Sequence, residues 1–171
     1  PEHFATQLDM YYVKPLYVAV LQGTVMLGAN PITAIMSLSL LSGLLINVLI
    51  FHWLRSVTTT VTAAALVILF AITARLIDLS RIPTPDNFSA LFVLAGIYLL
   101  LVKKWLIPAI AVLCASVLIR TNNMVFVGLV LTYLLWSRYH LTGNFKDTQF
   151  KVAAAGLIIS VSAYLITNSL F

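Results

Sequence analysis

The residues most able to do chemistry gather in the segment from Arg75 to Asn87, which reads RLIDLSRIPTPDN. It holds two arginines, two aspartates and two prolines, and it lies between two long apolar runs. Ionisable side chains are costly next to hydrocarbon, so such a cluster at the mouth of a helix pair marks a candidate site. Its arginines could bind a phosphate group in bidentate fashion.

Two further polar stretches carry candidate site residues. The first runs from Asp9 to Lys14 and contains Tyr12, and the second runs from Arg120 to Asn123. Arg120 stands between two short apolar segments, where its charge needs a partner of opposite sign. The amides of Asn122 and Asn123 cannot neutralise it, so we interpret Arg120 as a residue with a function rather than a purely structural one.

Several of these residues also have structural explanations, which the sequence leaves open. Arg75 and Asp78 lie three apart and could neutralise one another on a helix surface. Asp86 could serve only to begin a helix, because a carboxylate complements the positive end of the helix dipole. Arg81 could extend its charged end to lipid headgroups while its stem stays in the apolar layer.

The elements that position these residues follow from composition. The 171 residues are 61% hydrophobic and 9% charged, whereas a soluble domain has roughly 25% charged residues. Apolar runs of about 20 residues recur without alternation, which favours membrane-spanning helices over a barrel. We expect an all-α, polytopic transmembrane helical bundle of about six spanning helices plus a short interfacial helix. The net charge of +5 fits Lys and Arg kept on the cytoplasmic side, with lipids and not nucleic acid as partners.

The expected elements follow the apolar runs. The interfacial helix covers 16–27, and single spans cover 32–54, 58–77, 84–102 and 152–171. Arg120 to Asn123 divides 105–136 into two short helices, and a polar loop covers 138–151. We treat residues 1–171 as one transmembrane domain. Because the chain begins at Pro1 without Met or signal-peptide character, we expect it to be a piece of a longer protein.

Polar residues mark several expected helix features. Asn30 and Pro31 form a break with a helix start, Thr84 is the expected N-cap before Pro85 at the first helical position, and Thr121 could cap the helix after Arg120. Asn47 is expected to make a hydrogen bond to another helix. The three histidines show no metal-ligand spacing, so we expect no metal site.

Assigning the breaks alternately to the two sides of the membrane separates the charges. One side receives Arg55, Lys103, Lys104, Arg138, Lys146 and Lys151 against Asp147, and the other receives Lys14, Arg75, Arg81 and Arg120 against Glu2, Asp9, Asp78 and Asp86. The positive-inside rule assigns the first side to the cytoplasm. All three polar stretches then share the extracytoplasmic face, where one cavity could hold a ligand with a phosphate head and a lipid tail.

Six short segments of this sequence resemble the GT-C superfamily of polytopic glycosyltransferases. In order along the chain they are YVKPLY at 12–17, LGANP at 27–31, TPD at 84–86, ALF at 90–92, YLLL at 98–101 and LIRTNN at 118–123. The sequence is similar to the polyprenyl-phosphate-sugar-dependent group that includes the protein mannosyltransferases and the lipid A aminoarabinose transferases.

The resemblance implies a multi-pass enzyme, in a bacterial inner membrane or cell envelope, whose site faces the periplasm or exterior. An acidic residue, Asp9 or Asp86, would activate the acceptor, and the substrate-binding set would be Lys14, Tyr12, Arg75, Arg81, Arg120, Asn122 and Asn123. The substrate is a lipid-linked sugar, and no cofactor is expected. The family's aspartate usually follows the first transmembrane helix. No such helix precedes Asp9, so the base could also lie upstream of Pro1.

Two other function classes remain open at this stage. Half of a transporter or flippase would place the breaks at Gly28 to Pro31 and at Arg120 to Asn123 near the middle of the bilayer. A non-catalytic membrane subunit is the third hypothesis. The depth of Arg120 relative to Asp86 separates the first two, since about 10 Å or less favours the transferase and ~15 Å, half a bilayer, favours the transporter.

Overall fold

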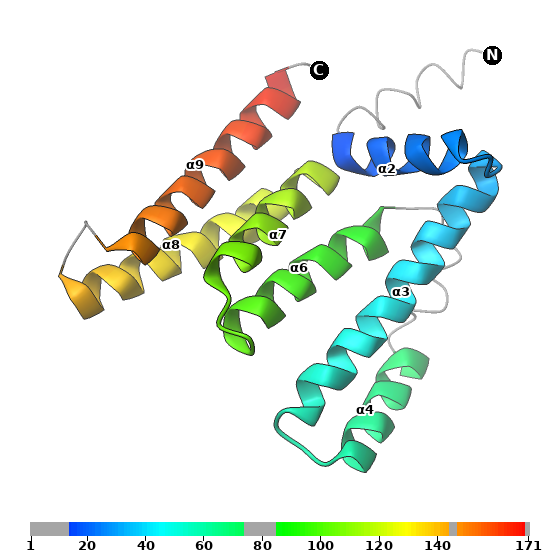
Figure 1. Cartoon of the computed structure of the whole chain (residues 1–171), viewed down its shortest axis with the longest axis horizontal. Coiled ribbons are helices and arrows are strands. Elements are labelled where there is room, and N and C mark those ends of the chain that lie inside the picture. Colours follow the sequence, from blue (N-terminus) through cyan, green and yellow to red (C-terminus); the bar gives the residue numbers. More distant parts are fainter. Residues whose placement is uncertain (1–13, 74–84, 144–146, 170–171) are drawn as a thin grey trace.

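Helices make up all the regular structure in the residues that the computed structural model describes, which are 14–73, 85–143 and 147–169 (Figure 1). They are, in chain order, α2 (Pro15–Met26), α3 (Pro31–Arg55), α4 (Thr60–Thr73), α6 (Asp86–Leu101), α7 (Leu106–Ile119), α8 (Asn123–Thr142) and α9 (Thr148–Ser169). The expected all-α helical membrane bundle is confirmed.

Three helices of the described part are long and apolar enough to cross a membrane, at Pro31–Arg55, Asn123–Leu141 and Thr148–Ser169. Helices α4, α6 and α7 have 14, 16 and 14 residues. At 1.5 Å per residue they are roughly 21 to 24 Å long, shorter than a hydrocarbon layer of about 30 Å. The expected number of six spans therefore stays a prediction.

The helix starts follow their prolines, with two corrections. Pro31 begins α3, and the Asn30 side chain accepts a hydrogen bond of 3.0 Å from the Ile32 amide, as expected. Pro85 precedes the first helical residue of α6 and does not occupy it, and Thr84 lies outside the described residues. Thr121 does not cap α8, because Asn122 takes the cap position and gives no side-chain cap bond.

The expected polar loop at 138–151 is wrong at both ends. Helix α8 continues to Thr142 and ends where Gly143 adopts a left-handed backbone with φ of 59°. Helix α9 begins at Thr148, and its Phe150 amide donates to Asp147 Oδ2 at 3.3 Å. Polar residues can remain helical where a helix leaves the apolar layer, because their side chains then reach water. The same correction makes α8 longer than the short helix expected after Arg120.

Asn47 also departs from expectation. Its Nδ2 donates to the carbonyl of Gly43 at 2.8 Å, one turn earlier in the same helix. The expected bond to another helix is therefore replaced by a local one, which satisfies the amide N–H without a partner helix.

Helices α3 and α6 run side by side in the same direction. Asn87 Nδ2 donates to Ser39 Oγ at 3.4 Å near their starts, and the rings of Trp53 and Tyr98 lie 6.4 Å apart near their ends. Helix α7 returns antiparallel to α6, and α8 turns back again (Figure 1). The bundle therefore has an "Asp86 end", where α6 and α8 begin, and a "Lys104 end", where α7 and α9 begin.

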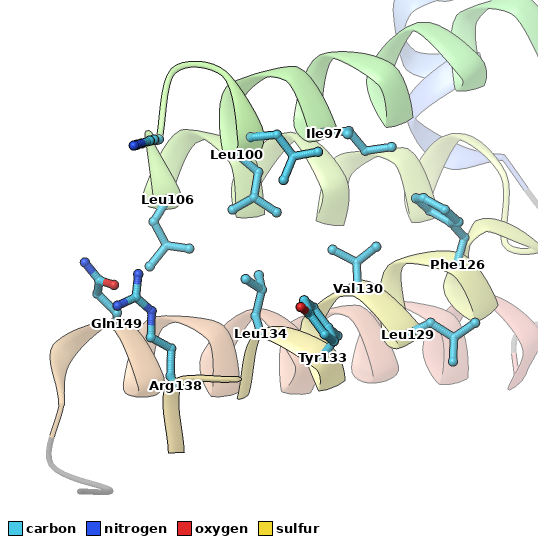
Figure 2. A pocket seen from close by; sticks show the side chains of 12 residues that line it. Ile97, Leu100, Leu106, Phe126, Leu129, Val130, Tyr133, Leu134, Arg138 and Gln149 are labelled. Carbon is cyan, nitrogen blue, oxygen red and sulfur yellow. The ribbon is translucent and has the colours of Figure 1, made fainter. Parts of the chain in front are cut away.

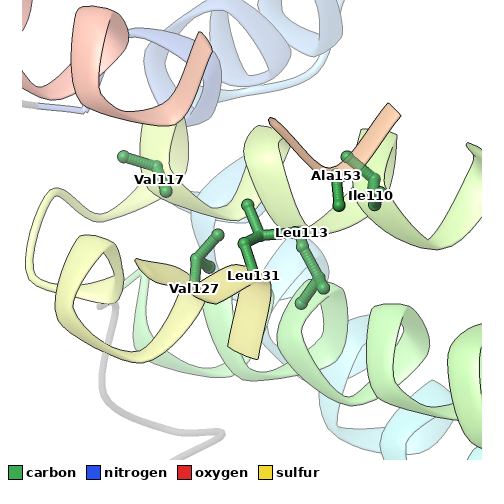
Figure 3. Close-up of a cluster of buried hydrophobic side chains, with 6 residues drawn as sticks. All are labelled: Ile110, Leu113, Val117, Val127, Leu131 and Ala153. Carbon is green, nitrogen blue, oxygen red and sulfur yellow. The ribbon is translucent and has the colours of Figure 1, made fainter. Parts of the chain in front are cut away.

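The main core joins α7, α8 and α9. Its buried side chains come from all three helices and point toward one another in Figure 3; they are Ile110, Leu113, Val117, Val127, Leu131 and Ala153. Gly156 lets α9 approach closely, since a Cβ there would lie 2.4 Å from Ile110 Cγ2. A missing side chain thus sets the spacing between α7 and α9.

The outer surface is apolar where a soluble protein would be polar. On α3, Leu40, Leu44 and Val48 lie one turn apart and are 63%, 61% and 45% exposed. A continuous exposed apolar stripe is unfavourable in water and favourable against lipid tails. The protein is an integral membrane protein, as expected.

Candidate functional site

An ion pair between Arg120 and Asp86 forms the centre of the candidate site. The Arg120 Nη1 group donates to Asp86 Oδ1, and both side chains are about two-fifths exposed. Asp86 is the first residue of α6, where its charge also complements the helix dipole. Asp86 is thus the acid that neutralises Arg120, and the pair remains accessible to a ligand.

The backbone after α7 gives Arg120 its position. Its amide donates to the Ser116 carbonyl at 3.0 Å, and its φ of −148° and ψ of 113° then turn the chain out of the helix. The amides of Asn123 and Met124 donate to the carbonyls of Arg120 and Thr121, which closes a tight turn into α8. Helix α7, helix α8 and this turn between them hold Arg120 level with the start of α6.

Lys14 lies within electrostatic range of both charges of the pair. It immediately precedes α2 and is half-buried. Burial lowers the pKa of its ammonium from the ordinary value of 10.5; the Asp86 carboxylate partly raises this pKa, and the Arg120 guanidinium lowers it again. Two cations against one carboxylate leave a net positive charge, which favours an anionic ligand.

Asn123 ties three helices together beside this pair. Its Nδ2 donates to Ser89 Oγ at 2.7 Å and to the Ser116 carbonyl at 3.0 Å. These bonds join the first turns of α6 and α8 to the last turn of α7. Its amide N–H groups are thus used to hold the turn that carries Arg120.

Asn122 is exposed on the same turn and borders a shallow groove of about 490 Å³. The groove follows α8 and reaches Tyr164 of α9, and its walls include Met124, Val125 and Leu129. A polar rim with apolar walls is the arrangement expected of a site for an amphipathic molecule.

Helix α2 lies across the Asp86 end of the bundle (Figure 1). Tyr17 is only 2% exposed and packs against Phe88 and Ile119, with its ring 6.1 Å from that of Phe88. This small aromatic cluster fixes α2, and with it Lys14, to the first turn of α6 and the last turn of α7.

The structure thus brings Lys14, Asp86, Arg120 and Asn123 together, with Asn122 beside them. The other predicted site residues, Asp9, Tyr12, Arg75 and Arg81, lie outside the described residues. So does Asp78, the alternative partner of Arg75. Direct pairing places Arg120 and Asp86 at one depth, which is the outcome that favours a transferase over a transporter.

Sequence reasoning missed the serines that organise this site. Ser89 lies three residues after Asp86, so both face the same side of α6. Ser116 precedes Arg120 by one helical turn and accepts through its backbone. The spacing of Asp86 and Ser89 can be seen in the sequence. The hydrogen bonds from Asn123 cannot be predicted without knowing that α6 and α8 begin at the same end of the bundle.

The family model described as dolichyl-phosphate-mannose-protein mannosyltransferase matches residues 13–168 of the chain. The match includes Lys14, Asp86, Arg120, Asn122 and Asn123, and it covers all the described helices except the last residue of α9. No curated protein and no solved structure gives a significant match.

Proposed function

We propose a specific reaction for this chain, which belongs to the dolichyl-phosphate-mannose-protein mannosyltransferase family. Membership makes it a membrane glycosyltransferase of the mannosyltransferase type. The proposed reaction transfers a sugar from a polyprenyl-phosphate donor to a hydroxyl group of an extracytoplasmic acceptor. The donor is the lipid-linked sugar itself, and no further cofactor takes part.

The observation that carries this proposal is the meeting of Lys14, Asp86 and Arg120 at one end of the bundle. In the transfer, the acceptor oxygen bonds to C1 of the sugar while the bond from C1 to the phosphate oxygen breaks. The phosphate then departs with an additional negative charge. In this proposal Lys14 and Arg120 stabilise that charge, which lowers the barrier to bond cleavage.

The acceptor proton must pass to a base as the new bond forms. Asp86 is the carboxylate within the described cluster, and Asp9 is the second candidate. Asp86 also orients Arg120 through Oδ1. Asn123 acts as a positioning residue, because it holds the turn on which Arg120 lies.

The lipid part of the donor is proposed to lie in the groove beside Asn122. Its apolar walls lie next to the turn that carries Arg120, so the phosphate could reach the cations while the chain stays in the apolar layer. Charge asymmetry supports an extracytoplasmic orientation of this end. In the described residues the opposite end carries most of the basic side chains, namely Arg55, Lys103, Lys104, Arg138 and Lys151.

The proposal is tested by transfer from polyprenyl-phosphate mannose with the full-length protein in membrane vesicles. Arg120→Gln should lower the rate about 10- to 100-fold, because a charge-assisted bond to the phosphate is lost. Arg55→Gln removes an exposed arginine at the opposite end and should leave the rate unchanged. If the Arg120→Gln protein inserts normally and transfers at the wild-type rate, Arg120 does not bind the donor.

A further inference from the structure

A second groove, of about 550 Å³, opens between α6, α7 and α8 and reaches the start of α9 (Figure 2). Its charged mouth lies at the Lys104 end, and its apolar end reaches Phe126 in the first turn of α8. Its walls are almost entirely apolar and include Ile97, Leu100, Val130 and Leu134. Its polar side chains are Lys104, Tyr133, Arg138 and Gln149.

Charge is gathered at one mouth of this groove. Figure 2 shows Arg138 and Gln149 together at that mouth, with Phe126 and Leu129 at the other end of the groove. Lys104 lines the same mouth from the loop between α6 and α7. In the described residues this end of the bundle has five basic side chains and one acid, Asp147. The mouth is therefore complementary to an anion.

The backbone around the mouth adds to this complementarity. Helices α7 and α9 both begin here, at Leu106 and Thr148, and helix starts carry partial positive charge. Lys104 also has a left-handed backbone, with φ of 57°. Glycine or asparagine adopts that conformation more readily than lysine does. The loop geometry would favour glycine or asparagine at this position. The lysine there places a positive charge at the rim of the groove.

The length of the groove indicates which kind of lipid fits it. Residues 126–138 of α8 follow its wall, and at 1.5 Å per residue they cover about 18 Å. One leaflet of the hydrocarbon layer is about 15 Å deep. A chain that enters at the charged mouth would thus end near the middle of the bilayer, as the acyl chains of a phospholipid do.

We infer that this groove binds an anionic phospholipid of the leaflet at the Lys104 end, with its phosphate between Lys104 and Arg138 and an acyl chain along α8. The phosphate-binding mouth is separate from the transfer site, because it lies at the other end of α6 and α7 from Asp86 and Arg120, and the two grooves adjoin only at Leu129 of α8. Helix α6 alone has 16 residues, which separates the two ends by about 24 Å.

The inference is tested with the full chain purified in detergent and incubated with phosphatidylglycerol or phosphatidylcholine, bound lipid being counted by native mass spectrometry. The wild type should retain phosphatidylglycerol preferentially. Lys104→Asn removes the charge but suits the left-handed backbone, and with Arg138→Gln it should weaken phosphatidylglycerol retention roughly 25-fold, about fivefold for each basic side chain. Equal retention by this double variant and the wild type would overturn the inference.

Two controls separate the groove from the surface around it. Lys103→Gln removes a neighbouring exposed charge that does not line the groove, so it should leave retention unchanged. Leu101→Trp adds bulk from a 60% exposed position in the groove wall, so it should reduce retention with all charges intact. Equal wild-type retention of phosphatidylcholine, or displacement of phosphatidylglycerol by an equal amount of polyprenyl phosphate, would also contradict a phospholipid site.

Discussion

Arg120 and Asp86 form an ion pair that joins the end of α7 to the start of α6 across 34 positions of the sequence. The pair is partly exposed, and Lys14 adds a second cation to it. A purely structural pair at a helix end would need no such excess of positive charge. The arrangement is better suited to receiving a phosphate.

Exchanging the two charges distinguishes a structural pair from a functional one. The double variant Asp86→Arg with Arg120→Asp should re-form the ion pair and have a higher thermal midpoint than either single variant, although both exchanged charges oppose the helix dipoles. Transfer should stay at least tenfold reduced, because the cation and the carboxylate have exchanged places relative to Lys14 and the donor. Recovery of wild-type transfer by the exchanged pair would show that only its structural role matters.

The lowered pKa of Lys14 predicts a cost in stability. Burial, the main cause, disfavours the ammonium in the folded state. The cost is fully present below the lowered pKa and is relieved as pH rises from there toward 10.5, the range in which the unfolded chain binds more protons than the folded one. Lys14→Met should therefore keep or raise the thermal midpoint at pH 7 while it lowers transfer. A clear loss of stability at pH 7 would contradict this.

The same shift predicts how donor binding depends on pH. As the Lys14 ammonium loses its proton, the apparent KM for the donor should rise, beginning below pH 10.5. Lys14→Arg keeps the charge and should remove this alkaline rise, which is measured as KM against kcat from pH 7 to 10. An unchanged alkaline profile in Lys14→Arg would separate Lys14 from donor binding.

Much of the fold follows from the sequence because prolines and apolar runs act locally. Pro31 begins α3 as expected, and Pro15 begins α2, one residue before the expected start at 16. Hydropathy could not locate the end of α8, since Arg138 and His140 stay helical where the helix leaves the apolar layer. For such residues, leaving the membrane and ending a helix are separate events.

The need of Arg120 for a partner could be predicted from the sequence, but the identity of that partner could not. Four acids, Glu2, Asp9, Asp78 and Asp86, were expected on the same face of the membrane as Arg120. Only the meeting of the end of α7 with the start of α6 selects Asp86. The role of Asn123 was less accessible, because its bonds to Ser89 and Ser116 depend on three helix ends at once.

Close helix packing gives a prediction about stability alone. A Cβ on Gly96 would lie 2.6 Å from the buried Leu113 Cγ and 3.3 Å from the Ala109 carbonyl oxygen. Gly96→Ala should therefore lower the free energy of unfolding by about 1 to 3 kcal/mol. Gly23→Ala is the matched control, because nothing lies within 4 Å of its Cβ and alanine favours the helix by about 0.5 to 1 kcal/mol. The free energy of unfolding in detergent should fall for Gly96→Ala and rise for Gly23→Ala. A change in the same direction for both variants would refute the packing argument.

The paired cations also predict how transfer responds to a chelator. Lys14 and Arg120 already supply the positive charge that a departing phosphate needs. Transfer by the full-length protein should therefore be unchanged after treatment with excess EDTA. A loss that added Mg²⁺ or Mn²⁺ restores would show that these cations do not suffice.

The most direct test of the central claim is equilibrium binding of polyprenyl phosphate to the purified full-length protein. Arg120→Gln and Lys14→Gln should each weaken binding about tenfold relative to the wild type, and Arg55→Gln should bind as the wild type does. Unaltered affinity in both Arg120→Gln and Lys14→Gln would mean that the cluster at the Asp86 end does not hold the donor phosphate.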